Sequence, residues 1–166
     1  MNGHPNPPRR QNPLLSPPQR PLPGRVAIVG AGTIGPDIGY YLKSTIADLG
    51  MVLVDVAREP LDAALKRIEA HVEKGLARGK LTEDRAASVT TDLVPTLDLE
   101  EIAGCDWVIE AASEDLDLKR GLFDRIEAIV GDETVITSNT SSLPAERLVS
   151  GLRRPGRATV THFFAP

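Results

Sequence analysis

The chain has 166 residues, a length that suits one domain with a real hydrophobic core and is short for two. Its formal net charge is −4, and because residues 1–24 hold three arginines and no acid, the remainder carries −7. An acidic body argues against a nucleic-acid-binding surface. The single cysteine, Cys105, excludes an internal disulfide, and we expect it to fill a small apolar space in a reducing compartment.

Residues 1–24 contain eight prolines, which predict a disordered or polyproline-like tail. The prolines also exclude the amphipathic helix of an organelle transit peptide, and no apolar stretch resembles a signal peptide or a membrane span. We therefore expect a soluble, cytoplasmic protein. The tail either binds a proline-recognising module or is simply solvated. The folded domain is expected over residues 25–166.

From Arg25 onward, short apolar runs alternate with segments of helical periodicity. Strands are predicted at 26–29, 51–54, 88–91, 107–109, 134–137 and 157–163. Helices are predicted over 34–45, 60–79, 81–87 and 118–129, with brief ones after Asp98 and Pro144. Strands that are continuous apolar runs, each followed by a helix, indicate a parallel sheet covered on both faces. The expected fold is an α/β, Rossmann-type, doubly wound sheet.

A glycine-rich motif lies between the first strand and the first helix: Gly30, Ala31, Gly32, Thr33, Ile34 and Gly35. In this context Gly30 can make a tight turn, Gly32 can let the backbone approach a pyrophosphate, and Gly35 can pack the helix on the strand. The helix N-terminus then offers free N–H groups and a positive dipole to the phosphates. The alternative is a tight turn that binds no ligand.

An acidic residue, Asp55, ends the second strand twenty residues after Gly35. A carboxylate there can accept hydrogen bonds from a ribose 2′-hydroxyl and repel a 2′-phosphate, which favours NAD over NADP. The nearby Arg58 leaves NADP open as an alternative, unless it is merely an exposed arginine at a helix start. The simpler interpretation of Asp55 is an ordinary acid at a strand end.

Hydride transfer from an alcohol needs a base for the hydroxyl proton, and histidine suits that task. His4 lies in the tail and His71 in the long helix, which leaves His162 at the carboxyl end of the sixth strand, where open parallel sheets bind ligands. Residues 139–142, Asn-Thr-Ser-Ser, reach the same edge, and their hydroxyls could orient a substrate. The alternatives are a packed strand-end histidine and, for Ser142, a cap of the following helix.

Five segments resemble, in order, the amino-terminal domain of the L-3-hydroxyacyl-CoA dehydrogenases, including the 3-hydroxybutyryl-CoA enzymes: GAGTIG, LVDV, VIEAASEDLDLK, SNTSSLPAE and THFFAP. The resemblance covers residues 25–166. It implies NAD-linked interconversion of L-3-hydroxyacyl-CoA and 3-oxoacyl-CoA, as in fatty-acid β-oxidation, with no metal. The family continues with a glutamate that partners the histidine and a helical domain that completes the acyl pocket and forms a homodimer, and this sequence contains neither.

The resemblance also implies roles for individual residues. His162 falls on the catalytic histidine, and Ser141 on the serine that touches both cofactor and substrate oxygen. Glu114 and Lys119 fall on cofactor-contacting positions, and Arg78 falls where the family places a basic residue against CoA. Without the resemblance, Glu114 is expected to be a first-turn helix acid, Lys119 a solvated charge and Arg78 a surface arginine.

The sequence departs from the family pattern at three positions. Ala165 replaces an asparagine that contacts the cofactor, and Pro36 and Asp37 stand where small residues are usual. Asp37 is expected to bring negative charge near the phosphates. These departures favour a divergent branch, so two alternatives stay open: a non-catalytic NAD-binding module, and a dehydrogenase of another hydroxy acid. An interaction protein recruited through the tail is a further alternative. The chain by itself is expected to bind NAD far better than it turns over substrate.

Overall fold

The structure is a computed structural model that describes residues 21–164. Most of the predicted tail therefore lies outside the described residues, and so does the departure at Ala165. In the described part of the chain, no helix is long and apolar enough to cross a membrane.

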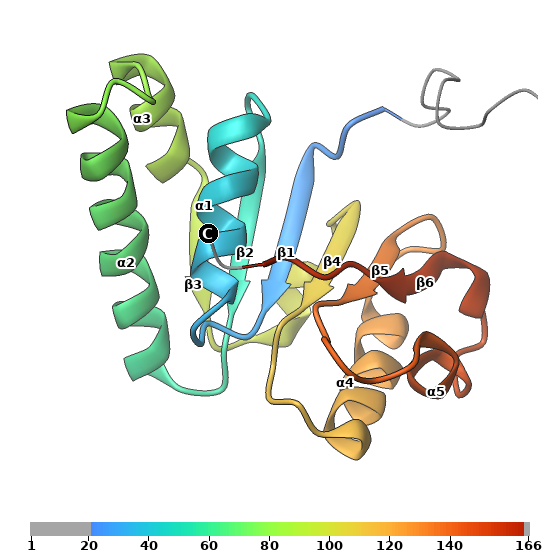
Figure 1. Cartoon of the computed structure of the whole chain (residues 1–166). Coiled ribbons are helices and arrows are strands. Elements are labelled where there is room, and N and C mark those ends of the chain that lie inside the picture. The colour runs from blue at the N-terminus through green and yellow to red at the C-terminus, as the bar shows by residue number, and fades with distance from the viewer. Residues whose placement is uncertain (1–20, 165–166) are drawn as a thin grey trace, which may run out of the picture.

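Six parallel strands form one sheet with helices on both faces (Figure 1). The strands are β1 (Arg25–Val29), β2 (Gly50–Val54), β3 (Leu93–Thr96), β4 (Trp107–Glu110), β5 (Val135–Ser138) and β6 (Ala158–Val160). The helices are α1 (Gly35–Thr45), α2 (Arg58–Ala77), α3 (Glu83–Thr90), α4 (Leu116–Ile129) and α5 (Ala145–Val149), with short 3-10 turns η2 (Leu99–Ile102) and η3 (Pro155–Arg157). The strand order, β3-β2-β1-β4-β5-β6, confirms the predicted doubly wound Rossmann fold.

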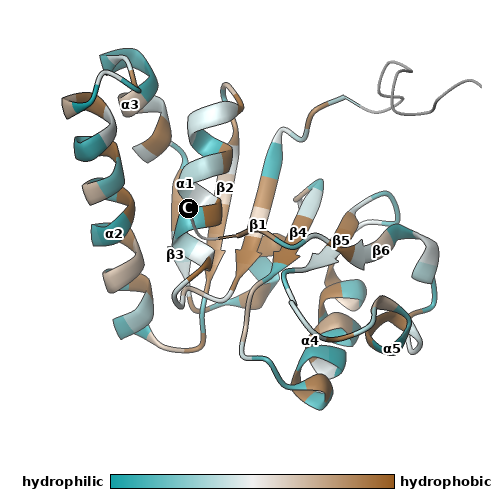
Figure 2. Ribbon diagram, in the orientation of Figure 1, coloured by the Kyte–Doolittle hydropathy of each residue, from teal (hydrophilic) through white to brown (hydrophobic). Residues whose placement is uncertain are grey.

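Alternate residues of the central strands pack against helices on opposite faces of the sheet, as the two-residue period of a strand requires. The face covered by α4 and η2 buries Ala27, Val52, Val108, Phe123, Ile126 and Ile102. The face covered by α1 and α2 buries Val26, Ile28, Leu53, Ile38 and Leu61. Figure 2 shows the hydrophobic residues concentrated in the strands, while α2 mixes hydrophobic and hydrophilic positions along its length. Because both faces are covered, only the two ends of the sheet are free to bind a ligand.

The third strand lies at 93–96, so its prediction at 88–91 is wrong. The side chain of Thr82 accepts a hydrogen bond from the Arg85 backbone N–H, and the helix that it caps continues to Thr90. Val89 is fully buried in a cluster with residues of α2, so its apolar side chain serves helix packing rather than the sheet. β3 follows and tolerates Pro95 because it is an edge strand.

Three smaller predictions concern the connections. Asp98 caps η2 by accepting a hydrogen bond from the Glu100 N–H, as expected of a brief helix there. The sixth strand is shorter than predicted and ends at Val160. Cys105 is buried before β4, and burial raises the pKa of its thiol to about 11.

Candidate cofactor site and active site

The loops after β1, β4 and β5 lie at the carboxyl edge of the sheet, where the strand order reverses between β1 and β4. Open α/β sheets bind ligands at such a switch point. The glycine motif follows β1, residues 111–115 follow β4, and residues 139–144 follow β5. Nearly all of the candidate site residues are therefore on loops at one edge.

Two glycines of the motif are required by close backbone contacts. Gly30 has a φ of 117°, and a Cβ placed on it would lie 2.5 Å from the carbonyl oxygen of Ala111. A Cβ on Gly35 would lie 2.0 Å from the carbonyl oxygen of Gly30. Gly32 differs from both, because nothing lies within 4 Å of a Cβ placed there. Gly30 and Gly35 hold the turn together, whereas the space above Gly32 is open to a ligand.

Asp55 binds the glycine motif directly. Its Oδ2 accepts a hydrogen bond of 2.8 Å from the backbone N–H of Ala31, and its Oδ1 accepts one of 3.2 Å from the N–H of Ala57. A carboxylate offers about four lone-pair positions, so two contacts leave capacity for a ribose hydroxyl. Arg58, the alternative partner of a 2′-phosphate, is exposed at the first position of α2 and does not line the neighbouring cavity.

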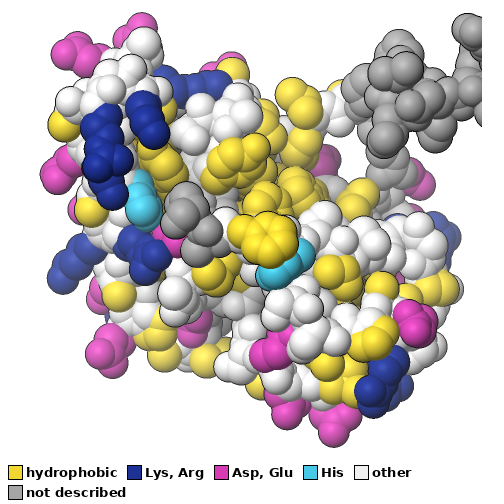
Figure 3. All heavy atoms as spheres, viewed as in Figure 1, with side chains coloured by type: hydrophobic (Ala, Val, Ile, Leu, Met, Phe, Trp, Pro, Cys, Tyr) yellow, Lys and Arg dark blue, Asp and Glu magenta, His cyan; other side chains and the backbone are white. Residues whose placement is uncertain are grey.

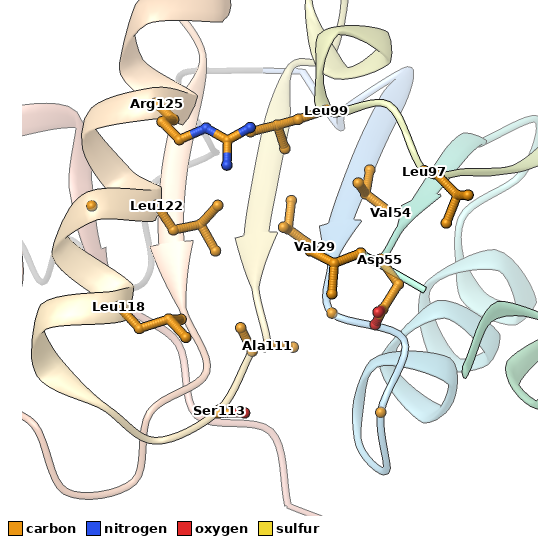
Figure 4. A pocket seen from close by; sticks show the side chains of 15 residues that line it. Val29, Val54, Asp55, Leu97, Leu99, Ala111, Ser113, Leu118, Leu122 and Arg125 are labelled. Atoms are coloured by element: carbon orange, nitrogen blue, oxygen red, sulfur yellow. The ribbon is translucent and has the colours of Figure 1, made fainter. Parts of the chain in front are cut away.

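A cavity of about 550 Å³ opens beside Asp55, between the ends of β1 and β2 and one side of α4 (Figure 4). Its walls are mainly apolar, with Val29, Val54, Leu97, Leu99, Leu118 and Leu122 among the lining residues, together with Asp55 and Arg125. Leu118, in the first turns of α4, is 47% exposed and lines the cavity rather than the core. A largely apolar slot beside a carboxylate suits a flat aromatic base attached to a ribose.

A buried ion pair lies behind the loops at the end of β4. Lys119 Nζ lies 2.8 Å and 2.9 Å from the two carboxylate oxygens of Glu110, and it also donates to the Ala112 carbonyl. Glu110 additionally accepts hydrogen bonds from the Ser138 hydroxyl and the Ala112 N–H. The expectation of a solvated Lys119 is therefore wrong. Lys119 lies four residues before Phe123 on the inward face of α4, which carries it to the end of β4.

Glu114 holds the residues on both sides of Ser141. Its Oε1 accepts hydrogen bonds from the Ser142 hydroxyl at 2.8 Å, from the Ser142 N–H at 3.3 Å, and from the Thr140 hydroxyl. Its Oε2 lies 3.4 Å from Lys119 Nζ. Burial alone would raise the pKa of Glu114, but the hydrogen bonds from Thr140 and Ser142 and the charge of Lys119 outweigh it and lower the pKa to about 2. The carboxylate is therefore ionised at neutral pH.

Two expectations about helix starts are wrong in this region. Glu114 is not a first-turn acid, because Asp115 is the N-cap of α4 and accepts a hydrogen bond from the Leu118 N–H. Ser142 does not cap α5, whose N-cap is Pro144 without a side-chain hydrogen bond. Ser142 lies two residues before that N-cap, and its hydroxyl donates a hydrogen bond to Glu114.

His162 and Ser141 are both exposed at the carboxyl edge of the sheet, on segments that follow the neighbouring strands β6 and β5. The His162 ring makes an edge-to-face contact with Phe164, with ring centroids 4.4 Å apart. The backbone on either side of His162 is attached to the end of β5: Thr161 N–H donates to the Ser138 carbonyl, and Phe163 N–H donates to Asn139 Oδ1. The two segments that follow β5 and β6, residues 139–144 and 161–164, are therefore held together, and we call them the exit segments.

Comparison with known proteins shows which family the chain belongs to. A family model described as "3-hydroxyacyl-CoA dehydrogenase, NAD binding domain" matches residues 25–166. The chain belongs to this family.

The relatives of this NAD-binding domain agree with the match. A 3-hydroxyadipyl-CoA dehydrogenase of Escherichia coli is 34% identical over 141 residues, which are 85% of this chain and 29% of that protein. The alpha subunit of the fatty acid oxidation complex of Idiomarina loihiensis is 31% identical over 84% of this chain and 19% of its own length. The crystal structure of (S)-3-hydroxybutyryl-CoA dehydrogenase from Ralstonia eutropha has a TM-score of 0.80 at 32% identity, covering 86% of this chain and half of that one. The chain thus spans less than a third of the length of the Escherichia coli and Idiomarina loihiensis proteins.

The structure separates Arg78 from the other candidate residues of the NAD-binding domain. α2 begins just after β2 at the carboxyl edge, and its 20 residues extend about 30 Å at 1.5 Å per residue. Arg78 is the C-cap of this helix, so it lies at the end remote from the glycine motif. Figure 3 shows other Lys and Arg side chains gathered over α2 as well, at the left of the view.

The negative charge of Asp37, one of the departures from the family, is compensated within the domain. Asp37 accepts two hydrogen bonds of 2.7 Å from Arg67 and lies 2.9 Å from Nε2 of His71, both on α2. Burial acts to raise the pKa of Asp37, yet the hydrogen bonds from Arg67 and His71 lower it overall. Asp37 thus joins α1 to α2, and its paired charge opposes phosphate binding less than an isolated one would.

Three residues have contacts or places in the site that the sequence did not predict. Glu110 forms the buried ion pair, Asn139 joins the two exit segments, and Arg125 lines the cavity. An acid at the end of an otherwise apolar strand was an available signal for Glu110. Arg125 lies seven residues after Leu118, two helical turns along α4, and therefore on the same face of this helix. For the side-chain contact of Asn139, the sequence holds no local signal.

Proposed function

We propose that this chain is the cofactor-binding part of an enzyme that interconverts L-3-hydroxyacyl-CoA and 3-oxoacyl-CoA by hydride transfer. The observation that carries the proposal is the pairing of the two exit segments, which brings the segments of Ser141 and His162 to the sheet edge where the glycine motif begins. The printed names of the relatives support a CoA thioester as the substrate class. Because the chain spans only part of those relatives, the substrate and the activity of the whole protein are part of the proposal.

The residues of the site fit NAD. The open space above Gly32 and the N-terminus of α1 suit the pyrophosphate, the spare acceptor capacity of Asp55 suits a ribose hydroxyl, and the cavity suits the adenine. When bound, NAD supplies the group that exchanges hydride with carbon 3 of the substrate. Glu114 and Lys119 contribute by shaping the loop beside it.

His162 and Ser141 have complementary tasks in this proposal. His162 accepts the proton of the substrate hydroxyl as hydride leaves carbon 3, and returns it in the reverse direction. The Ser141 hydroxyl donates a hydrogen bond to the same substrate oxygen. Both side chains are exposed, so both are accessible to a substrate. Proximity and orientation on the bound cofactor supply much of the acceleration.

The proposal extends to the substrate's CoA moiety and to the rest of the protein. Arg78, at the end of α2 remote from the glycine motif, is proposed to contact the CoA moiety. A helical domain that completes the acyl pocket, homodimer formation and a cytoplasmic location belong to the same proposal. For the tail, binding to a proline-recognising module remains an alternative to a simply solvated segment.

Calorimetric titration with NAD and NADP, followed by an assay of NADH oxidation with acetoacetyl-CoA, tests the proposal. We expect NAD to bind more tightly than NADP because Asp55 would repel a 2′-phosphate. His162→Ala should lower the turnover about a hundredfold or more while NAD binding persists. His4→Ala, in the tail, is the matched control and should change neither. Absence of NAD binding would overturn the proposal. NAD binding without turnover would support a cofactor domain that needs its partner domain, whereas absence of turnover even after a partner domain is supplied would favour a non-catalytic module.

A further inference from the structure

One amide side chain connects the two segments that carry the candidate catalytic residues. Asn139 directly follows β5 and lies two residues before Ser141. Its Oδ1 accepts a hydrogen bond of 2.7 Å from the backbone N–H of Phe163, the residue after His162.

The contact extends the pairing between β5 and β6 beyond the end of their ladder. Thr161 N–H donates to the Ser138 carbonyl at 3.0 Å, as in a parallel ladder. The next residue, Asn139, directs its backbone N–H to the other side, as alternate residues of a parallel strand do, and donates to the backbone carbonyl of Glu110 on β4 at 2.7 Å. The Asn139 side chain then provides the acceptor for the next alternate N–H, that of Phe163. His162 is therefore the residue between two attached neighbours.

The side chain of Phe163 supports the same attachment. Its ring packs against Tyr41 at 6.2 Å and Trp107 at 6.5 Å between ring centroids. The His162 ring, in contrast, contacts Phe164, which is 81% exposed and offers little restraint. The position of the imidazole thus depends on how firmly the backbone is held at the residues before and after it.

We infer that Asn139 is a positioning residue: it sets the place of the His162 imidazole relative to Ser141 by holding Phe163 to the end of β5. The inference rests on the proposed function only in taking His162 as the base. Because Asn139 is part of the Ser141 loop, a shift of this loop carries the His162 segment with it, and the two groups keep their spacing.

NMR spectroscopy of the whole chain tests the inference with a pair of variants. Asn139→Ala removes the accepting oxygen, whereas Asn139→Asp keeps an oxygen in the same place. Thr159→Ala, at an exposed position of β6, is the control for any change in this strand. The readouts are the amide exchange rate of Phe163, the ring resonances of His162 with and without NAD, and the Kd for NAD. The three histidines of the chain make the ring signals easy to assign.

In Asn139→Ala we expect Phe163 to exchange about tenfold faster, as loss of one hydrogen bond predicts. The NAD-induced shift of the His162 ring should fall to less than half, while the Kd for NAD changes less than about threefold because the glycine motif is untouched. Asn139→Asp and Thr159→Ala should behave like the wild type. Rescue by aspartate separates positioning from a general loss of structure.

Unchanged Phe163 exchange and His162 resonances in Asn139→Ala would overturn the inference, and so would failure of Asn139→Asp to restore them. A failure of the proposed function would appear in a different measurement, the NAD titration. If the wild-type chain bound no NAD, the titration would show it, whereas the amide exchange and the ring resonances of the free protein would still decide whether Asn139 holds the His162 segment.

Discussion

Lys119 and Glu110 form an ion pair that water does not reach: Nζ lies 2.8 Å from Oε1, and the side chains are 1% and 0% exposed. The pair joins α4 to the end of β4, directly behind the loops that follow β4 and β5. Ser138, at the end of β5, donates its hydroxyl to the same carboxylate. One buried charge pair therefore ties together both strands whose exits carry Glu114 and Ser141.

Removing one member of this pair should destabilise the fold strongly. Lys119→Met leaves Glu110 buried without a counter-charge, so we expect the free energy of unfolding to fall by about 3 to 5 kcal/mol. Urea denaturation measures this change in the free energy of unfolding. The double variant Glu110→Gln/Lys119→Met should lose less than the two single losses combined, since it buries no unpaired charge. Lys80→Met, at an exposed position, is the control, and an equal loss there would contradict the role of the pair.

The two glycines Gly32 and Gly35 should respond in opposite ways to alanine. Gly32→Ala meets no atom within 4 Å, so the fold should keep its stability, whereas NAD should bind about tenfold more weakly because the methyl group occupies the pyrophosphate space. Gly35→Ala would place its Cβ 2.0 Å from the Gly30 carbonyl oxygen and should destabilise the fold itself. Thermal unfolding and calorimetric titration separate the effects. Normal NAD affinity in Gly32→Ala would argue against this binding mode.

Glu114 should make stability depend on pH in the acid range. Its pKa is lowered from 4.5 to about 2 in the folded protein, so its contribution is present above about pH 4.5 and is lost as pH falls toward 2. Because the side chain is 40% exposed, we expect only about 1 kcal/mol after screening by solvent. Glu114→Gln should therefore be less stable than the wild type at pH 6, and the difference should shrink toward pH 3. A constant difference would contradict the assignment.

Arg67 should protect NAD binding from the charge of Asp37. Arg67→Ala leaves the Asp37 carboxylate in the first turn of α1 without its main partner, so NAD should bind about threefold to tenfold more weakly. Asp37→Gly removes the charge and should leave the affinity unchanged or slightly higher. Arg85→Ala, on α3, removes an arginine that bonds to the Thr45 carbonyl and serves as the control. Weaker binding in Asp37→Gly than in Arg67→Ala would reverse this interpretation.

The first β-α-β unit could be predicted because its signals are local. The apolar run of β1, the glycines and the acid Asp55 follow one another within 31 residues, and each has its own conformational or chemical reason. The third strand could not be located in the same way. Val89 suits a strand by propensity, but the cap at Thr82 and packing against α2 favour a helix. Tertiary contacts override local preference at such a position.

The sequence by itself determined the strand-glycine-helix order, the Rossmann class and the residue types available at the carboxyl edge. Only the tertiary structure decided how those residues pair: Asn139 with Phe163, Glu114 with Ser142, and Arg67 with Asp37. These partners lie 24, 28 and 30 residues apart along the chain. The physical reason is that a hydrogen bond depends on position in space. Neighbours at the sheet edge are set by the strand order β1-β4-β5-β6, and the partners Arg67 and Asp37 by the packing of α2 against α1, rather than by spacing along the chain.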